Sequence, residues 1–116
     1  AKDDAEDTEE IFLRLATIYM EQERFGNIIA LQSQEPENLL TKWMIARSYQ
    51  EIEDLDKAYE LYQELSSDLK DNPEFLEQYT YLLRELGYFE EAKKQAEAYL
   101  KLIPDDVQMQ ELLETL

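Results

Sequence analysis

The stretch Glu53-Asp54-Leu55-Asp56-Lys57-Ala58 aligns with a second stretch, Gly87-Tyr88-Phe89-Glu90-Glu91-Ala92. The equivalent residues Ala58 and Ala92 are 34 residues apart, and apolar residues on both sides recur with helical spacing. A fixed period of this size is typical of solenoids in which each helical hairpin buries its apolar face only against its neighbours. The repeat therefore predicts an all-α chain.

Turn-forming residues divide the chain into repeats. All of its glycines and prolines fall where helices should turn, at Gly26, Gly87, Pro36, Pro73 and Pro104. We predict one domain, residues 8–116, preceded by an acidic tail of residues 1–7. The domain contains three hairpins and a last helix that either caps the stack or begins a further repeat. Their expected bounds are about 9–38, 39–72 and 73–106, with the terminal helix at 105–116.

Three local signals mark the ends of helices. Asp7 or Thr8 is expected to cap the first helix. Asn72 followed by Pro73 predicts the start of the third hairpin, because asparagine is a good N-cap and proline suits the first helical position. Gly87 is expected in the left-handed conformation that ends a helix.

Composition excludes several classes of function. The chain has 116 residues and a net charge of −17, which disfavours binding to phosphate backbones or to anionic membranes. It contains no cysteine and no histidine, so it lacks thiolate chemistry and the side chain best suited to proton transfer at neutral pH. The carboxylates of Glu51, Glu53, Asp54 and Asp56 fall in a predicted turn, where they should be solvated. We therefore predict no catalytic residues, no metal and no cofactor.

Bulky, small and aromatic residues recur at equivalent positions of the repeats. In the third repeat these are Leu76, Tyr79, Leu83, Gly87, Phe89, Ala92, Ala96, Tyr99 and Pro104. In the second they are Ile45, Ala46, Tyr49, Leu55, Ala58, Tyr62 and Leu65, and in the first Phe12, Leu15, Ala16, Tyr19 and Phe25. This pattern resembles the tetratricopeptide repeat family. The first repeat departs from it, because Pro36 arrives early and the repeat is four residues short.

The resemblance implies a right-handed superhelix whose concave face binds a peptide or helix of another protein. In this family the first helix of each repeat lines that face. The apolar, aromatic and arginine residues at the corresponding positions are Leu13, Met20, Leu40, Trp43, Arg47, Tyr81 and Arg84. Tryptophan, tyrosine and arginine dominate binding hot spots because they combine large buried area with directed hydrogen bonds.

Two of these assignments have alternatives. Trp43 could be a core residue displaced by one place from the family's aromatic position, which holds Lys42. Arg47 and Arg84 could pair with nearby carboxylates such as Glu51 or Glu85, in surface ion pairs worth little energy.

One known mode of binding in the family does not fit this sequence. Some members hold a partner's C-terminal carboxylate with lysine and asparagine on these helices. This chain has Leu13, Trp43 and Glu77 at one of the positions concerned, and Thr17, Arg47 and Tyr81 at another. Recognition of a chaperone tail by such a clamp is therefore not expected.

The predicted function is a protein-interaction module located in the cytoplasm and not an enzyme. Its partner is another protein, for which a basic segment would suit the acidic surface, and neither nucleic acid nor membrane is expected. The alternative is a structural role, either as a segment of a longer solenoid or as a scaffold. In the second case the chain would self-associate through Met109, Leu112, Leu113 and Leu116 of its last helix.

Overall fold

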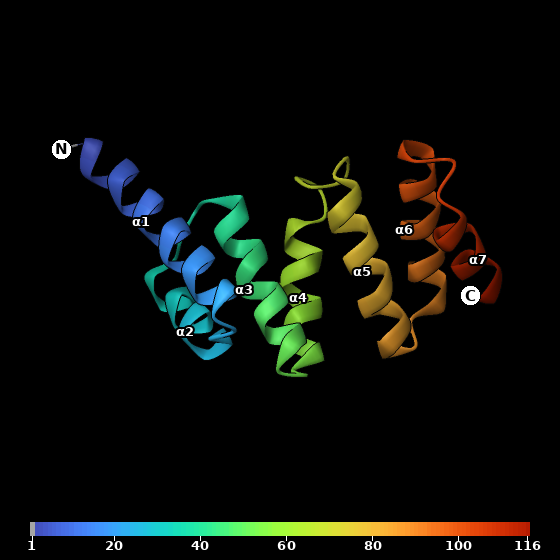
Figure 1. Ribbon diagram of the computed structural model, residues 1–116, viewed down its shortest axis with the longest axis horizontal. Coiled ribbons are helices and arrows are strands. Elements are labelled where there is room, and N and C mark those ends of the chain that lie inside the picture. Colours follow the sequence, from blue (N-terminus) through green and yellow to red (C-terminus); the bar gives the residue numbers. More distant parts are fainter. Residues whose placement is uncertain (1) are drawn as a thin grey trace. The chain divides into compact units, whose positions relative to one another are not determined.

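The computed structural model describes the backbone of residues 2–116 and the side chains from residue 8 onwards. This part of the chain is helical, with no strand (Figure 1). The helices are α1 (Lys2–Glu21), α2 (Phe25–Ala30), the 3-10 helix η1 (Leu31–Gln34), α3 (Leu39–Glu51), α4 (Leu55–Leu65), α5 (Pro73–Leu86), α6 (Phe89–Leu102) and α7 (Val107–Thr115). The all-α prediction, with three hairpins and a terminal helix, is confirmed.

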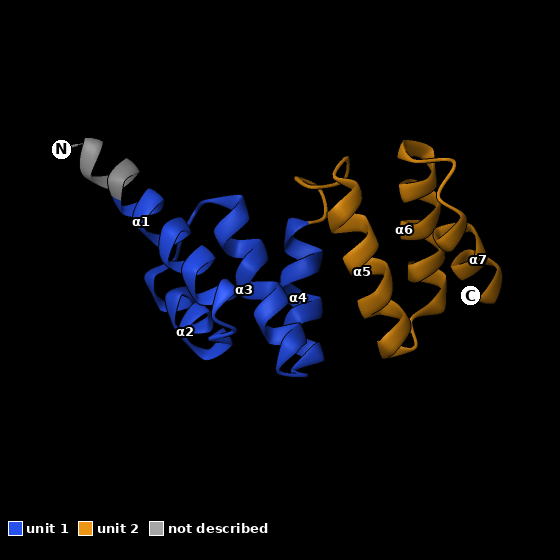
Figure 2. Cartoon of the chain, in the orientation of Figure 1, with its two compact units in different colours: residues 1–65 blue, residues 66–116 orange. Residues whose placement is uncertain are grey.

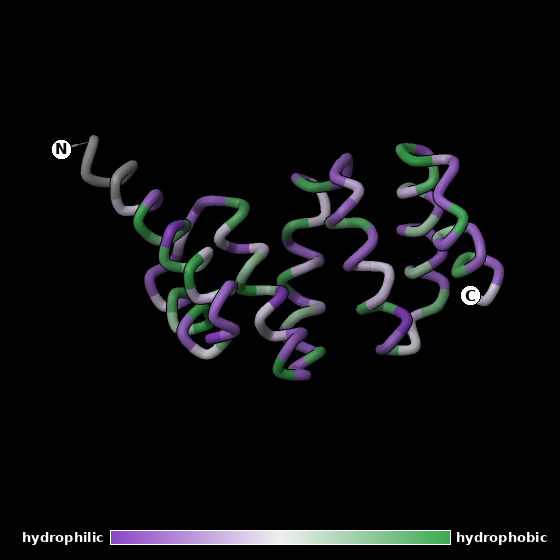
Figure 3. Tube along the Cα trace, viewed as in Figure 1, coloured by the Kyte–Doolittle hydropathy of each residue, from purple (hydrophilic) through white to green (hydrophobic). Residues whose placement is uncertain are grey.

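The chain divides into two compact units, residues 1–65 and residues 66–116 (Figure 2). Hydrophobic and hydrophilic residues are interspersed along the helices of both units (Figure 3). Each unit has buried side chains of its own. Fully buried in unit 1 are Ala16, Ile28, Ala46, Ala58 and Tyr62. The fully buried apolar side chains of unit 2 include Phe75, Leu82, Leu83, Ala92 and Ala96.

A left-handed residue closes each of the three hairpins. Glu23, Glu53 and Gly87 have φ angles of 57°, 65° and 81°. The amide N–H after each of them donates to a carbonyl five residues earlier. These bonds run from Arg24 to Tyr19 (2.8 Å), from Asp54 to Tyr49 (2.9 Å) and from Tyr88 to Leu83 (2.9 Å). The expectation for Gly87 is confirmed, and the same turn forms where the other two repeats carry glutamate.

Asparagine side chains cap the first turns of α3 and α5. The side-chain oxygen of Asn38 accepts hydrogen bonds from the backbone N–H groups of Leu40 and Thr41. Asn72 accepts one from Phe75, directly before Pro73, as predicted. These caps satisfy amide groups that have no partner within the helix.

The start of α1 differs from the expectation. The helix begins at Lys2, so Asp7 and Thr8 lie within it and neither is an N-cap residue; the side chain of Asp7 is outside the described side chains. The segment expected as an acidic tail is therefore helical in its backbone from residue 2. One acidic residue of α1 fixes the chain elsewhere, since the Glu9 carboxylate accepts the backbone N–H groups of Glu37 and Asn38 at 2.9–3.1 Å.

The short first repeat ends in a tightened turn. α2 has only 6 residues and continues as η1, after which Glu35 takes a left-handed φ of 50° ahead of the buried Pro36. The second helix of this repeat is thus shortened, as the early proline indicates.

The two glycines allow a matched test of the left-handed turn. A Cβ atom would meet nothing within 4 Å at either Gly26 or Gly87, but only Gly87 has a positive φ. We expect Gly87→Ala to lower the free energy of unfolding by about 1 kcal/mol, because a left-handed residue with a side chain is strained. Gly26→Ala should raise it by up to about 1 kcal/mol, because Gly26 lies in a helix. Urea denaturation measures both, and changes of the same sign would contradict this account of the turn.

Candidate functional site

The predicted groove residues are divided between the two units. Unit 1 carries Leu13 and Met20 on α1, and Leu40, Trp43 and Arg47 on α3. Unit 2 carries Tyr81 and Arg84 on α5.

Trp43 is a core residue rather than a surface anchor. Only 7% of its side chain is exposed, and α3 packs against α1, α2 and α4. The half-buried Lys42 occupies the family's aromatic position, so the tryptophan lies about 100° further round the helix. The expectation that Trp43 presents its ring to a partner is therefore replaced by the core alternative.

The remaining predicted residues of unit 1 retain accessible surface. Leu40 is 46% exposed, and Arg47 is half-buried. These two residues are seven apart on α3 and so share a face, as do the half-buried Leu13 and Met20 on α1. The role of these four residues in binding stays a prediction.

Tyr81 and Arg84 line a shallow groove within unit 2. The guanidinium carbon of Arg84 lies 5.3 Å from the centroid of the Tyr81 ring, within range of a cation–π interaction. The groove has a volume of about 420 Å³. Its other lining residues belong to α7 and are Gln108, Glu111, Leu112 and Thr115.

The predicted site did not include the α7 side of this groove. Gln108, Glu111 and Thr115 lie 34 residues after Glu74, Glu77 and Tyr81 of α5, so they occupy equivalent positions of the next helix of this type. Extending the period by one more helix would have identified them. From the sequence, Leu112 is expected to act only in self-association.

Asp106 anchors α7 and thereby positions this side of the groove. One carboxylate oxygen accepts the backbone N–H of Met109, and the other accepts the hydroxyl of Tyr99 on α6. The Tyr99 bond, followed by that from Met109, lowers the pKa of Asp106. The bond to Asp106, together with burial, raises the pKa of Tyr99 to about 12. Gln110 on α7 also donates to the carbonyl of Pro104 at 2.6 Å.

The apolar residues of α7 are mostly used inside unit 2. Met109 and Leu112 are buried, and Leu113 and Leu116 are half-buried. This packing leaves little apolar surface on α7 for the self-association considered from the sequence.

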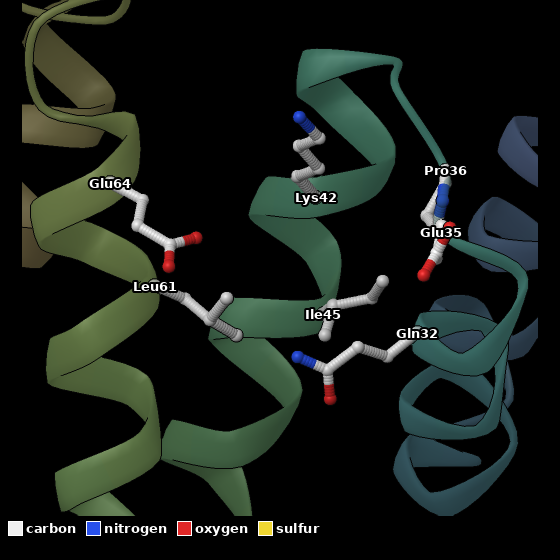
Figure 4. Close-up of a pocket in the computed structure, with 7 residues that line it drawn as sticks. All are labelled: Gln32, Glu35, Pro36, Lys42, Ile45, Leu61 and Glu64. Atoms are coloured by element: carbon white, nitrogen blue, oxygen red, sulfur yellow. The ribbon is translucent and has the colours of Figure 1, made fainter.

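Unit 1 has a smaller pocket of a different kind. It holds about 140 Å³ between η1, α3 and α4, with Ile45 and Leu61 among polar and charged side chains (Figure 4). A second hollow of about 230 Å³ shares Gln32, Leu61 and Glu64 with it. The ammonium of Lys57, which lines the second hollow, lies 5.6 Å from the centroid of the Tyr49 ring. The mixed charges of these two hollows do not define one class of ligand.

From residue 8 onwards, no group of three or more His, Cys, Asp or Glu side chains is arranged to hold a metal ion. Within the same part of the chain, no helix combines the length and apolar character needed to cross a membrane.

A family model described as "YpiA-like, C-terminal tetratricopeptide repeats" matches residues 40–106. The chain belongs to this tetratricopeptide-repeat family. The matched residues run from the start of α3 to the end of the turn before α7, so they include Asp106 and the α5 side of the groove.

A solved tetratricopeptide-repeat structure has the same fold. It is the first such domain of Spaghetti (RPAP3), bound to the HSP90 peptide SRMEEVD, and it has a TM-score of 0.77. The match covers 92% of this chain and 90% of that one, at 16% sequence identity. No curated protein sequence matches the chain.

We expect α7 to depend on Asp106 in a pH-dependent way. Asp106→Ala removes the cap and the Tyr99 bond, so the amides of α7 should exchange with solvent faster than in the wild type. Asp106→Asn keeps a capping oxygen but removes the charge. Because folding lowers the pKa of Asp106, its carboxylate stabilises the fold above the usual aspartate pKa of about 4, and this contribution is lost as the pH falls through the lowered value.

Thermal melting of the wild type and of Asp106→Asn measures this effect. The difference between their midpoints should be constant between about pH 7 and 5 and should shrink below about pH 4. A difference that stays the same down to about pH 2 would show that the charge of Asp106 does not stabilise the fold.

Proposed function

We propose that this tetratricopeptide-repeat chain is a protein-interaction module that binds a peptide or helix of another protein in the groove of unit 2. The observation that supports this most directly is the pairing of Tyr81 and Arg84 beside the α7 side chains. The groove is lined by two successive first-type helices, α5 and α7, on which Tyr81 and Thr115 hold equivalent positions. Such helices bind partners in the family that the sequence resembles.

The lining indicates which chemistry the partner segment needs. The half-buried ring of Tyr81 and the side chain of Leu112 offer apolar surface, and the exposed guanidinium of Arg84 can donate to a carboxylate or a backbone carbonyl. Glu111 on the opposite side can accept from a basic side chain. A segment with an apolar residue flanked by charges of both signs would match this arrangement.

We do not propose that this chain binds the kind of peptide seen in the structural relative. Some family members hold a C-terminal carboxylate with lysine and asparagine at two of the groove positions. This chain instead has Leu13, Trp43 and Glu77 at one, and Thr17, Arg47 and Tyr81 at the other. We therefore propose an internal segment of the partner rather than its C-terminus. Leu13, Met20, Leu40 and Arg47 are proposed as further contacts on unit 1, and the cytoplasm as the location.

Affinity capture from a lysate of the source organism tests the groove of unit 2. Tyr81→Ala combined with Arg84→Glu removes the ring and reverses the charge, and we expect the captured partner to bind at least about 30-fold more weakly. This corresponds to the roughly 2 kcal/mol typical of a hot spot. Trp43→Ala is unsuitable for this purpose, because truncating a buried aromatic residue destabilises the fold by about 3–5 kcal/mol.

Lys94→Glu provides the control. Lys94 is an exposed residue of α6 outside the groove lining, and its substitution changes the net charge by the same amount as Arg84→Glu. The proposal predicts that this variant captures the partner normally. Equal losses for Lys94→Glu and for the groove variant would indicate attraction by overall charge and would contradict the proposed site.

A further inference from the structure

The smaller hollow of unit 1 lies where the short first repeat ends. That repeat is four residues short, which corresponds to about one turn, or roughly 6 Å, of α-helix. One wall of the hollow is formed by Gln32, Glu35 and Pro36, which follow the short helix α2. The opposite wall is formed by Leu61 and Glu64 of α4 (Figure 4). The hollow thus lies at the point where this chain departs from the repeat pattern.

The floor of this hollow is apolar, and its size suits one side chain. Ile45 on α3 is only 2% exposed, and the half-buried Leu61 faces the same space. The volume is about 140 Å³, and that of the neighbouring hollow is about 230 Å³. Each is smaller than the roughly 300–1,000 Å³ typical of pockets for drug-sized molecules. Side chains of an extended segment therefore fit these hollows better than a compact small molecule does.

A hydrogen bond orients the amide of Gln32, which lines both hollows. The largely buried Tyr49 donates its hydroxyl to Oε1 of Gln32 at 2.6 Å. The amide nitrogen then points toward the space between Ile45 and Leu61 (Figure 4). It makes no hydrogen bond to another described residue. Gln32 is thus oriented in advance to donate to a backbone carbonyl of a bound segment, which lowers the cost of binding.

The carboxylates around the hollows have no basic partner in the described part of the chain. The side chains of Glu35, Glu60 and Glu64 take part there in no ion pair and no hydrogen bond. Glu60 and Glu64 are four residues apart on α4, where like charges repel each other. A cationic group placed between them would relieve this repulsion.

The two lysines of the lining are directed elsewhere. The ammonium of Lys57 lies 5.6 Å from the centroid of the Tyr49 ring rather than beside a carboxylate. That of Lys42 points away from the apolar floor, whereas Glu35 and Glu64 approach it from opposite walls (Figure 4). The signs of the charges are mixed, so the directions of the groups decide which ligand fits. These directions favour a cationic ligand.

We propose that the hollows between η1 and α4 bind an extended segment of a partner protein in which an apolar residue is flanked by arginine or lysine. The apolar side chain covers Ile45 and Leu61. The basic side chains pair with Glu35 on one wall and with Glu60 or Glu64 on the other. This surface shares no residue with the groove of unit 2, so it does not rest on the function proposed for that groove.

A second copy of the chain and an anionic ligand both fit this surface less well. The net charge of the chain is −17, so a second copy would bring mainly negative charge to carboxylates that are already unpaired. A phosphate or carboxylate ligand would be repelled for the same reason. Only a basic partner makes the burial of the apolar floor and the pairing of the carboxylates favourable together.

A blocked pentapeptide with leucine between two arginines (acetyl-Gly-Arg-Leu-Arg-Gly-amide) is a suitable probe. Titration of this peptide into the isotope-labelled chain at low salt, followed by two-dimensional NMR, measures both affinity and location. We expect the largest changes in amide shift at residues 32–36 and 57–64. Replacing the leucine of the peptide by serine should weaken binding, and replacing both arginines by glutamate should abolish it.

Matched substitutions in the chain test the carboxylates. Glu60→Gln with Glu64→Gln should weaken binding of the probe about fivefold or more. Both residues are exposed, and the change removes a repulsion, so the melting midpoint should not fall. The control is Glu85→Gln with Glu97→Gln, two exposed carboxylates of unit 2 outside its groove lining, which changes the net charge equally. It should alter the affinity less than about twofold.

The proposal is wrong if the probe causes no shift changes or causes them only outside residues 32–64. It is also overturned if both pairs of substitutions weaken binding equally, because attraction by overall charge would then explain the binding. Equal binding of the peptide with glutamate in place of arginine would likewise contradict a site for basic segments.

Discussion

A left-handed backbone turn closes each helical hairpin, and the rest of the structure depends on this closure. The turn brings the second helix back along the first, so that the fully buried Ala58 and Ala92 can lie where the two helices approach closely. Glycine adopts this conformation without strain at Gly87, whereas Glu23 and Glu53 adopt it despite their side chains. Packing of the hairpins therefore offsets a local backbone strain in the first two repeats.

The same regularity places the candidate binding groove. Tyr81 on α5 and Thr115 on α7 occupy equivalent positions of successive first-type helices, so the repeat brings both to one groove. One carboxylate contributes to the position of this groove, since Asp106 both caps α7 and accepts the Tyr99 hydroxyl from α6. Stability of the last helix and shape of the binding surface are thus linked through one residue.

The sequence predicts the hairpins well because their determinants are local. The Asn72 cap and the left-handed Gly87 each act within a few residues, and the 34-residue period repeats such signals along the chain. Site residues were harder to predict because exposure depends on packing between helices. A shift of one position places Trp43 in the core, and the direction of the Gln32 amide depends on Tyr49, which lies 17 residues further along the chain. The α7 side of the groove was predictable in principle, by extending the period to Gln108, Glu111 and Thr115.

The central claim is that the groove of unit 2 contacts a protein partner in the cell. Site-specific photo-crosslinking tests it most directly, with a benzophenone amino acid introduced at position 81 and, in a separate chain, at the exposed position 94 on α6. Our account predicts that a discrete partner is crosslinked from position 81 and not from position 94. Crosslinking from position 94 alone, or the same products from both positions, would contradict it.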